Sequence, residues 1–261
     1  MNRLFEADLL LRVEEAGINA SAPREQLWID GWLVRFSPGK VKRARCIQAV
    51  ASGRFPVEAR LKRCLAIYAS AGLRPYVRIT PFSEPVGLDQ QLADLGMERI
   101  DESLVMVASI PFSDGDSEAA GSLPSGTRFQ PAEAVAFAPW IGAKRGSSAD
   151  ESNALAQRLR DAPVQHCAVL VIDARGTAIA GGQVAVEDEL AGLYDIFTTD
   201  AARNRGIAEA LCRHLLSQAG QRGARIAYLQ VDANNDVARR VYRRLGFEDA
   251  YAYHYRSPPA R

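Results

Sequence analysis

The stretch LYDIFTTDAARNRGIAEALCRHLL, residues 193–216, joins a strand, a polar loop and a helix in that order. An apolar run predicts the strand over residues 190–198. A four-residue apolar spacing at Ile207, Leu211, Leu215 and Ala219 predicts one buried face of the helix. The stretch therefore predicts a strand that leads through a polar loop into a helix starting at Gly206.

The start of this helix has the composition of an anion-binding site. The first turn of a helix carries free N–H groups and a partial positive charge. Gly206 lets a ligand approach the backbone closely, and Ala208 keeps the next turn small. Arg203 and Arg205 add charge-assisted hydrogen bonds. These residues favour a diphosphate ligand, although a plain helix start with solvated arginines fits the same residues. The segment has neither a Walker loop nor a GxGxxG fingerprint.

The following segment, YLQVDANNDVARRVYRRLGFED, predicts a second strand–loop–helix unit. Its strand covers residues 227–231, and Asn234 or Asn235 is a suitable N-cap for the helix. Gly246 ends the helix and Phe247 anchors the chain behind it. Helical spacing then places Tyr242 at the helix edge, facing back toward the strand ends.

In the chain between residues 127 and 198, two helices are expected at 133–143 and 150–161, followed by an antiparallel meander of strands. The meander precedes the helix and strand described above. A sheet with this order is mixed and mostly antiparallel, with helices on its faces, which is an α+β fold.

Taken together, these motifs resemble the GNAT acyltransferase superfamily. The match consists of Arg203-x-x-Gly206-x-Ala208, followed by the block from Asn235 to Phe247. It covers residues 167–256 well and residues 127–164 loosely. The resemblance implies a three-layer α/β/α architecture and N-acetyltransferase activity. The acetyl group would pass directly from acetyl-CoA to an amine, a small molecule or a peptide, in a ternary complex.

The resemblance also implies which residues bind acetyl-CoA. Backbone N–H groups of the loop and first helical turn would hold the diphosphate. The strand end would pair with the pantetheine arm, and a backbone N–H there would hold the oxyanion. Asn235 would hold the pantetheine or order its own loop. The cofactor-binding residues implied in this way are Ile196, Phe197, Thr198, Arg203, Asn204, Arg205, Gly206, Ile207, Ala208 and Asn235.

Two residues are the candidates for catalysis. The resemblance implies that Tyr242 protonates the departing thiolate. A phenol of pKa about 10 is a weaker acid than a thiol of pKa about 8.5, so we expect Tyr242 to act as a hydrogen-bond donor. A buried core tyrosine is the alternative. Asp195, which interrupts an apolar strand beside the thioester site, is the candidate general base. A water chain without a dedicated base is the alternative to Asp195.

The chain also shows signs of an internal duplication. The small, polar segment at residues 113–127 predicts a linker. It separates two parts that share the order helix, glycine, strand, helix, Leu-Gly, strand. We therefore predict a degenerate GNAT-like domain over residues 1–118, a linker over 119–126 and a catalytic GNAT domain over 127–261.

The first copy lacks the residues that would carry chemistry. Aligning LADLGMER with VYRRLGFED places Leu92 where Tyr242 stands. Phe55 and Pro56 occupy the loop where free N–H groups are needed. We therefore expect the first copy to be non-catalytic and to shape the acceptor site.

The most basic segment of the first half lies between Gly31 and Ala49. Alternation at residues 32–36, a turn at 37–40 and a returning strand at 41–46 predict a hairpin. The hairpin would display Arg35, Lys40, Lys42, Arg43 and Arg45. These charges either protect an edge strand or form a basic lip for an acidic acceptor or for the 3′-phosphate of CoA.

Composition narrows the remaining possibilities. The 261 residues include 32 Lys and Arg against 31 Asp and Glu, a balance that disfavours nucleic-acid binding. No apolar run reaches the roughly 20 residues of a membrane-spanning helix. The four cysteines lack CxxC spacing, which favours buried thiols in the cytoplasm, and the three histidines lack metal-ligand spacing. We expect no metal, and a monomer or homodimer. A non-catalytic protein that binds or senses CoA is the competing interpretation.

Overall fold

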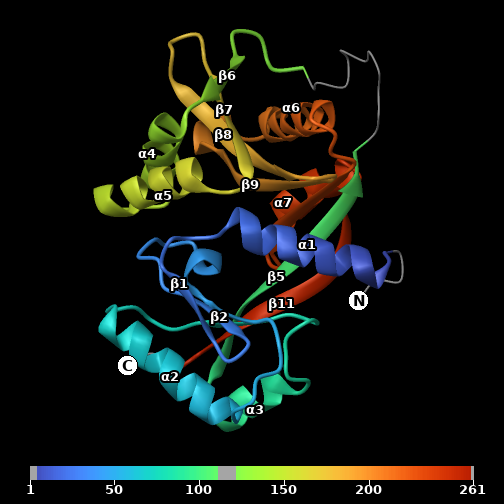
Figure 1. Cartoon of the computed structure of the whole chain (residues 1–261). Coiled ribbons are helices and arrows are strands. Elements are labelled where there is room, and N and C mark those ends of the chain that lie inside the picture. Colours follow the sequence, from blue (N-terminus) through green and yellow to red (C-terminus); the bar gives the residue numbers. More distant parts are fainter. Residues whose placement is uncertain (1–4, 111–121, 260–261) are drawn as a thin grey trace.

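The computed structural model describes residues 5–110 and 122–259. Its strands form one eleven-stranded mixed sheet in the order β1-β2-β3-β4-β11-β5-β10-β9-β8-β7-β6 (Figure 1). The strands are β1 (Gln26–Ile29), β2 (Trp32–Arg35), β3 (Ile47–Ala49), β4 (Val77–Ile79), β5 (Glu98–Ser109), β6 (Arg128–Ala132), β7 (Gln165–Ile172), β8 (Ala178–Glu187), β9 (Leu190–Thr198), β10 (Ile226–Asp232) and β11 (Glu248–Ser257).

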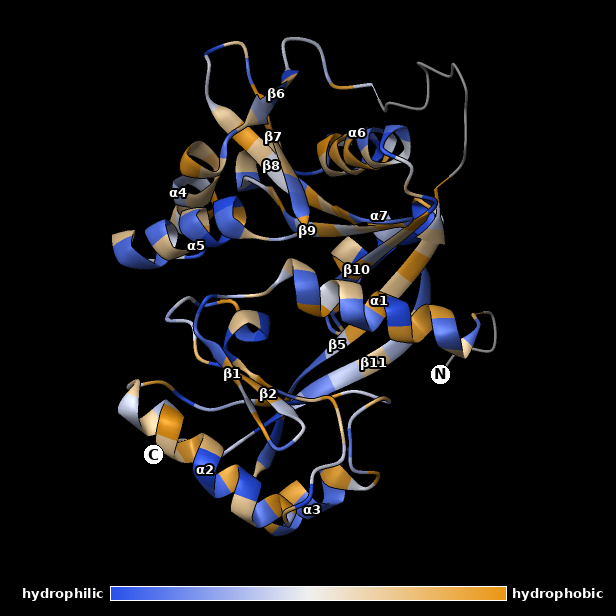
Figure 2. Ribbon diagram, viewed as in Figure 1, coloured by the Kyte–Doolittle hydropathy of each residue, from blue (hydrophilic) through white to orange (hydrophobic). Residues whose placement is uncertain are grey.

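Helices cover both faces of the sheet, which confirms the predicted α/β/α layering. They are α1 (Ala7–Ala20), α2 (Val57–Ser70), α3 (Leu88–Asp94), α4 (Ala134–Lys144), α5 (Ala149–Asp161), α6 (Ile207–Gln221) and α7 (Asp236–Arg244). Figure 2 shows mixed hydrophilic and hydrophobic faces on these helices, as expected when one side packs on a sheet. Ser148 and Glu151 form a capping box that starts α5 near its predicted position.

Successive side chains along β9 belong to the two opposite faces of the sheet. Leu193 belongs to the core cluster that contains the apolar side of α6. Its neighbour Tyr194 belongs to the cluster that contains α1. Successive side chains of a strand point to opposite faces, so α1 and α6 cover opposite faces of the sheet. A ligand that approaches the middle of β9 would therefore meet α6 on one face of the sheet and α1 on the other.

The two long central strands are exchanged between the halves of the chain. β5, from the first half, pairs antiparallel with both β10 and β11. β11, from the second half, pairs antiparallel with β4 of the first half. In Figure 1 the green β5 and the red β11 run side by side through the middle of the molecule. Each half therefore contributes one strand to the part of the sheet that the other half builds.

The helix endings repeat from one half to the other. The N–H of Met97 bonds to the carbonyl of Leu92 at the end of α3, and the N–H of Phe247 bonds to that of Tyr242 at the end of α7, both at 3.0 Å. Gly96 and Gly246 lie between these partners in the left-handed region, with φ of 79° and 86°. Leu92 thus occupies the position in α3 that Tyr242 occupies in α7.

The predicted hairpin over residues 31–49 is partly wrong. β2 and β3 do pair, but residues 42–45 form a 3₁₀ helix, η1 (Lys42–Arg45), instead of a returning strand. The tight turn lies earlier, at Asp30 and Gly31 between β1 and β2, where φ is 43° and 88°. Arg35 is also not displayed: its side chain is buried and donates to Gln26 and Ser21.

The linker predicted at 119–126 lies in part outside the described residues, so the division at this point stays a prediction. Cys46, Cys64 and Cys212 are buried and Cys167 is half-buried, each as a free thiol. In the described chain, none of the helices combines the length and apolar character needed to cross a membrane.

Candidate functional site

The candidate site lies where β9 and β10 separate. The two strands are paired in parallel from Leu190 and Ile226 up to Leu193 and Leu229. Both strands continue beyond this point, β9 to Thr198 and β10 to Asp232. A gap between two parallel strands leaves backbone N–H and C=O groups for a ligand, since such groups need partners.

A β-bulge in β9 marks the start of this separation. Gly181 of β8 faces Phe197, whereas Gln183 faces Tyr194, so two residues of β9 oppose the single residue Gly182. Asp195 sits in the bulge with φ of +57°. Positive φ is uncommon outside glycine and is seen most often with Asn and Asp. Bulges often re-aim a side chain near a site, and this one lies two residues after the last residue of β9 that pairs with β10.

Two glycines of β8 make room for the bulge. A Cβ atom on Gly182 would come within 2.4 Å of the Ile196 side chain, and one on Gly181 within 2.6 Å of Trp140. Ile196 packs into the core cluster on the α6 side, while Phe197 makes an edge contact with Trp140 of α4. The side chains of these two residues, out of the three predicted at the strand end to bind pantetheine, are thus used for packing, which leaves their backbone groups to a ligand.

The start of α6 has the form that the sequence predicts. Gly206 is the N-cap in the left-handed region with φ of 74°, and as a glycine it has no side chain with which to cap the helix. A Cβ atom on Gly206 would meet no heavy atom within 4 Å, so the space beside it is open. Asn204 also has positive φ, at 59°. The chain therefore approaches α6 with exposed backbone.

The polar groups around the start of α6 differ in whether they already have a partner within the protein. Arg203 pairs with Asp200 at 2.7 Å, so a bound anion would compete with that carboxylate. Arg205 is exposed. Within the described residues, the buried hydroxyl oxygen of Thr198 has no hydrogen-bond partner. A buried polar atom without a partner is costly, and a polar ligand in the gap would satisfy it. These residues fit the diphosphate and pantetheine of a CoA thioester.

Tyr242 lies on the α6 side of the sheet. Its ring contacts that of Phe247 edge-on at 6.0 Å between centroids and packs against the cluster that includes Leu193 and Cys212. Burial raises the pKa of Tyr242 above its ordinary value, and the nearby Cys212 adds to the rise. A phenol with a raised pKa holds its proton and donates hydrogen bonds at neutral pH.

Asn235 is the residue that caps α7. Its side-chain oxygen accepts a hydrogen bond from the backbone N–H of Ala238 at 3.1 Å. This contact matches the second of the two roles expected for Asn235, ordering of the loop between β10 and α7. A direct contact with pantetheine stays a prediction.

Asp195 makes two charge-assisted contacts. Arg145, at the end of α4, forms an ion pair with one carboxylate oxygen, and Gln183 of β8 donates to the other at 2.5 Å. Burial alone would raise the pKa of Asp195, but Arg145, together with Arg158 and Gln183, outweighs burial and the pKa is lowered. The carboxylate is therefore ionised and its oxygens are engaged.

Sequence reasoning missed two residues beside the gap, Gln183 and Arg145, and it named a third, Arg43, as part of the basic segment 31–49. Gln183 and Arg145 hold Asp195, and Arg43 of η1 donates to Gln230 of β10 at 2.7 Å. Arg43 carried a signal in the sequence, the basic segment near residue 40. Arg145 and Gln183 carried none, because only the packing of α4 and β8 beside β9 gives them a role.

Solved structures with a similar fold share this arrangement of strands and helices. A GCN5-related N-acetyltransferase from Kribbella flavida aligns with a TM-score of 0.67 and 19% identity, over 99% of this chain and 97% of that chain. A tandem GNAT protein of the clavulanic acid biosynthesis pathway aligns with a TM-score of 0.60 and 12% identity, over 78% of this chain and 70% of that chain. The protein has the fold of the GNAT acyltransferases.

The sequence comparisons define the family more closely. A model of the family described as "Probable histone acetyltransferase Rv0428c C-terminal" matches residues 10–256, and the chain belongs to this acetyltransferase family within the GNAT superfamily. The uncharacterized N-acetyltransferase YobR of Bacillus subtilis is 29% identical over 238 residues, covering 87% of this chain and 90% of YobR. The uncharacterized N-acetyltransferase MJ1207 of Methanocaldococcus jannaschii is 41% identical over 61 residues, which cover 23% of this chain and 27% of MJ1207.

Proposed function

We propose that the protein transfers an acetyl group from acetyl-CoA to an amine by direct attack in a ternary complex. The observation that carries this proposal is the separation of β9 from β10 next to the exposed start of α6. The strand gap fits the extended pantetheine arm and the helix start fits the diphosphate. Family membership supports acyl transfer in general, and the donor and the acceptor are the proposed part.

In this proposal the backbone does most of the donor binding. N–H groups from Arg205 to Ala208 hold the diphosphate, since the first turn of α6 leaves them free. The backbone of residues 196–198 pairs with the pantetheine arm. The hydroxyl of Thr198 supplies a further polar contact, because it is buried and unpartnered among the described residues. A backbone N–H at the bulge stabilises the negative charge that develops on the thioester oxygen.

Tyr242 acts on the leaving group, the thiolate of CoA. When the amine attacks the thioester carbon, the C–S bond breaks and negative charge develops on sulfur. The raised pKa of Tyr242 disfavours complete proton transfer to a thiolate of pKa about 8.5. Tyr242 therefore stabilises the thiolate as a hydrogen-bond donor, and water completes the protonation.

The proton of the attacking amine needs a different acceptor. Asp195 is the candidate from the sequence, and it lies in the bulge beside the proposed thioester position. Its lowered pKa makes it a weak base, and Arg145 and Gln183 occupy its oxygens. We therefore propose that Asp195 orders the bulge and Arg145, while water receives the proton. Its role as general base stays a prediction that a pH–rate profile decides.

The first half takes a supporting role in this proposal. We propose that residues 1–118 are a duplicated, non-catalytic GNAT-like copy whose η1 borders the acceptor side of the gap. Free cysteines support a reducing, cytoplasmic location. A protein that binds acetyl-CoA without turnover remains the second candidate, because the same donor contacts would serve it.

One assay separates the two candidates. Purified protein is mixed with acetyl-CoA and a panel of primary amines, and free thiol release is followed together with acetyl-CoA binding by calorimetry. Acetyl-CoA binding with amine-dependent thiol release supports the transferase. Binding without release for every amine supports the sensor, and absence of binding rejects both.

A further inference from the structure

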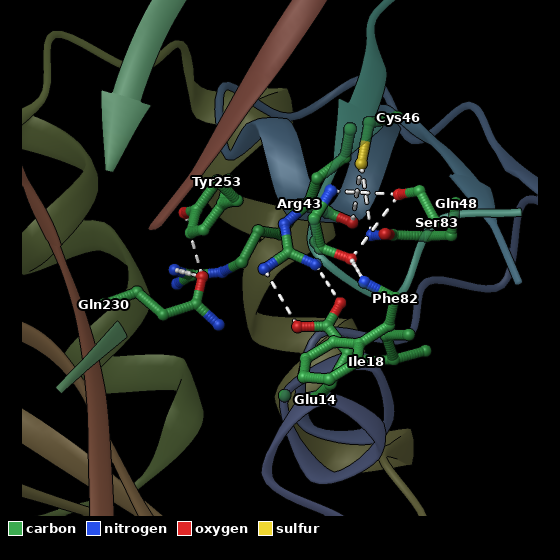
Figure 3. A network of polar contacts seen from close by, with 12 residues as sticks. Glu14, Ile18, Arg43, Cys46, Gln48, Phe82, Ser83, Gln230 and Tyr253 are labelled. Carbon is green, nitrogen blue, oxygen red and sulfur yellow. Dashed lines mark hydrogen bonds and ion pairs between the residues drawn. The ribbon is translucent and has the colours of Figure 1, made fainter. Parts of the chain in front are cut away.

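Arg43 of the first half lies at the mouth of the gap between β9 and β10. Its guanidinium donates to the side-chain oxygen of Gln230 on β10 at 2.7 Å and stands over the ring of Tyr194 on β9, 5.2 Å from the centroid. Gln230 directly follows the last paired residue of β10, and Tyr194 directly follows that of β9. Arg43 therefore touches both strands at the point where they separate. Figure 3 shows this surrounding network of polar contacts.

The hydrogen bonds of Arg43 are only partly used. Gln230 also accepts from the hydroxyl of Tyr253 at 2.9 Å, so one amide oxygen serves two donors. In the described chain, the Nε of Arg43 is buried without a hydrogen-bond partner, and no carboxylate lies within ion-pair distance of its guanidinium. A half-buried guanidinium in this state is costly for the protein alone.

Two further arginines share the space with Arg43. Arg145 and Arg158 line one cavity, and Arg158 donates to the backbone carbonyl of Ala20 at 3.3 Å. Burial lowers the pKa of Arg158; Asp195 opposes this effect, and the charges of Arg43 and Arg145 add to it. Two carboxylates lie beside them: Asp195, which pairs with Arg145, and Glu151, which lines the same cavity as Arg145 and Arg158. The group of Arg43, Arg145 and Arg158 therefore carries more positive charge than these two carboxylates balance.

Two neighbouring cations are balanced by carboxylates of the protein. Lys42 pairs with Asp101, and Arg78 pairs with Glu14, which also accepts from the hydroxyl of Tyr251 at 2.6 Å. Among the described residues, Arg43 and Arg45 of η1 have no carboxylate partner, and Arg43 is the one of the two that contacts Gln230 and Tyr194 beside the gap. Charge for edge protection alone would be expected at the exposed rim of the sheet instead.

We propose that the acceptor is an amine that also carries an anionic group, a carboxylate or a phosphate, and that Arg43 binds this group. A planar guanidinium is suited to both anions because it offers parallel N–H donors. The amine nitrogen would then reach the thioester in the gap while the anion completes the contacts of Arg43. This inference names the substrate class of the proposed transferase and therefore rests on that function.

The same charges argue against a lysine-rich tail as acceptor. The family description refers to a probable histone acetyltransferase. A polycationic peptide would approach three clustered guanidinium groups, and like charges at close range repel each other. The inference thus separates this chain from the activity that the family description suggests.

The first test uses matched pairs of amines with the wild-type protein. Glycine is compared with glycinamide, O-phosphoethanolamine with ethanolamine, and a lysine-rich peptide is included. We expect kcat/KM to be at least tenfold higher for the anionic member of one pair, which also identifies carboxylate or phosphate. Equal or higher values for the neutral amines or the peptide would overturn the inference and leave the transferase proposal intact. Acetyl-CoA binding with no amine acetylated would end both.

The second test changes Arg43. In Arg43→Gln we expect the anionic-to-neutral ratio of kcat/KM to fall at least tenfold, mainly through KM of the anionic amine. Arg43→Lys should restore part of the ratio, because it keeps the charge and loses the fork of donors. The control is Arg160→Gln on the exposed side of α5, where the ratio should not change. An unchanged ratio in folded Arg43→Gln removes Arg43 from acceptor binding, and if that variant does not fold, the wild-type pairs alone decide.

Discussion

The starts of α2 and α6 occupy equivalent places in the two halves, after β3 and β9. The backbone N–H groups at these two helix starts lie in different environments. Before α2, the carboxylate of Asp30 accepts from the N–H groups of Arg54 and Phe55, both at 2.8 Å. The N-cap itself is Pro56, which has no N–H. Before α6, the N-cap is the exposed Gly206.

This contrast shows how a carboxylate of the protein itself can fill the anion site at a helix start. Asp30 supplies the first half with the negative charge that a bound diphosphate would supply to the second. A Cβ on Gly53 would lie 2.3 Å from the carboxylate and from the carbonyl oxygen of Asp30, so the loop is packed tightly around it. One helix start is therefore satisfied by the protein, and we propose that a ligand satisfies the other.

The largest effect should come from giving α6 its own carboxylate. In Ala208→Glu the new side chain lies in the first turn, where it would occupy and repel the diphosphate site. We expect acetyl-CoA affinity to fall at least 100-fold, about 2.7 kcal/mol, as measured by calorimetry. Ala208→Gln is the control for size, and it should lose less affinity. Equal losses would mean that bulk, and not charge, explains the result.

Removing the hydroxyl of Tyr242 should affect turnover and not binding. In Tyr242→Phe the second half, like the first half with its Leu92, has no hydrogen-bond donor at this position. We expect kcat to fall at least tenfold with the Kd of acetyl-CoA nearly unchanged. Tyr68→Phe, which removes a buried hydroxyl bonded to the carbonyl of Arg35, is the control and should retain kcat. An unaltered kcat in Tyr242→Phe would remove this residue from the mechanism.

A smaller effect is expected from Asp195→Asn. Loss of the ion pair with Arg145 should lower kcat/KM several-fold by loosening the bulge. The acid limb of the pH–rate profile should keep its position, because the lowered pKa of Asp195 lies below the pH range where the amine titrates. A limb that moves or disappears would instead support Asp195 as the general base.

Asp30→Asn should destabilise the protein in a pH-dependent way without changing acetyl-CoA binding. The hydrogen bond from Phe55 is the main cause of the lowered pKa of Asp30. The stability that this carboxylate contributes is present above its unfolded pKa of about 3.9, and it is lost as the pH falls through the lower folded value. We therefore expect the fall in Tm to be clear near pH 7 and to shrink toward pH 2.5. Glu58→Gln, in the exposed first turn of α2, is the control for the loss of one carboxylate near this helix start.

The smallest effect should come from the cap of α7. Asn235→Ala removes the hydrogen bond to Ala238, whereas the equivalent helix α3 begins at Gly87 with no side-chain cap. We expect a loss of about 1 kcal/mol in the free energy of unfolding, measured with urea. A much larger fall in kcat/KM than this change explains would indicate that Asn235 also contacts the donor.

The local elements were predictable because their signals lie within short stretches. The apolar spacing from Ile207 to Ala219 gave α6, and Leu-Gly-Phe at 245–247 gave the end of α7. Gly206 was predicted as the exposed helix start because its neighbours form a contiguous motif. The alignment of Leu92 with Tyr242 was also recoverable, since both precede the same helix ending.

The features that the sequence did not predict depend on contacts between distant segments. The bulge at Asp195 needs Gly181 and Gly182 on the neighbouring strand. The carboxylate of Asp30 closes a loop more than twenty residues later, and nothing in its local pattern marks it as a cap. Arg35 lies in a strand pattern that suggests display, yet packing against residues 21 and 26 buries it.

The exchange of β5 and β11 has a consequence for how the chain folds during synthesis. The first half has no neighbour for the outer side of β4 until the segment 248–257 has emerged from the ribosome. Pairing between segments so far apart in sequence slows folding and leaves strand edges exposed in the meantime. The nascent N-terminal half should therefore bind holdase chaperones more strongly than an autonomous domain of the same size, and be released once the last strand is complete.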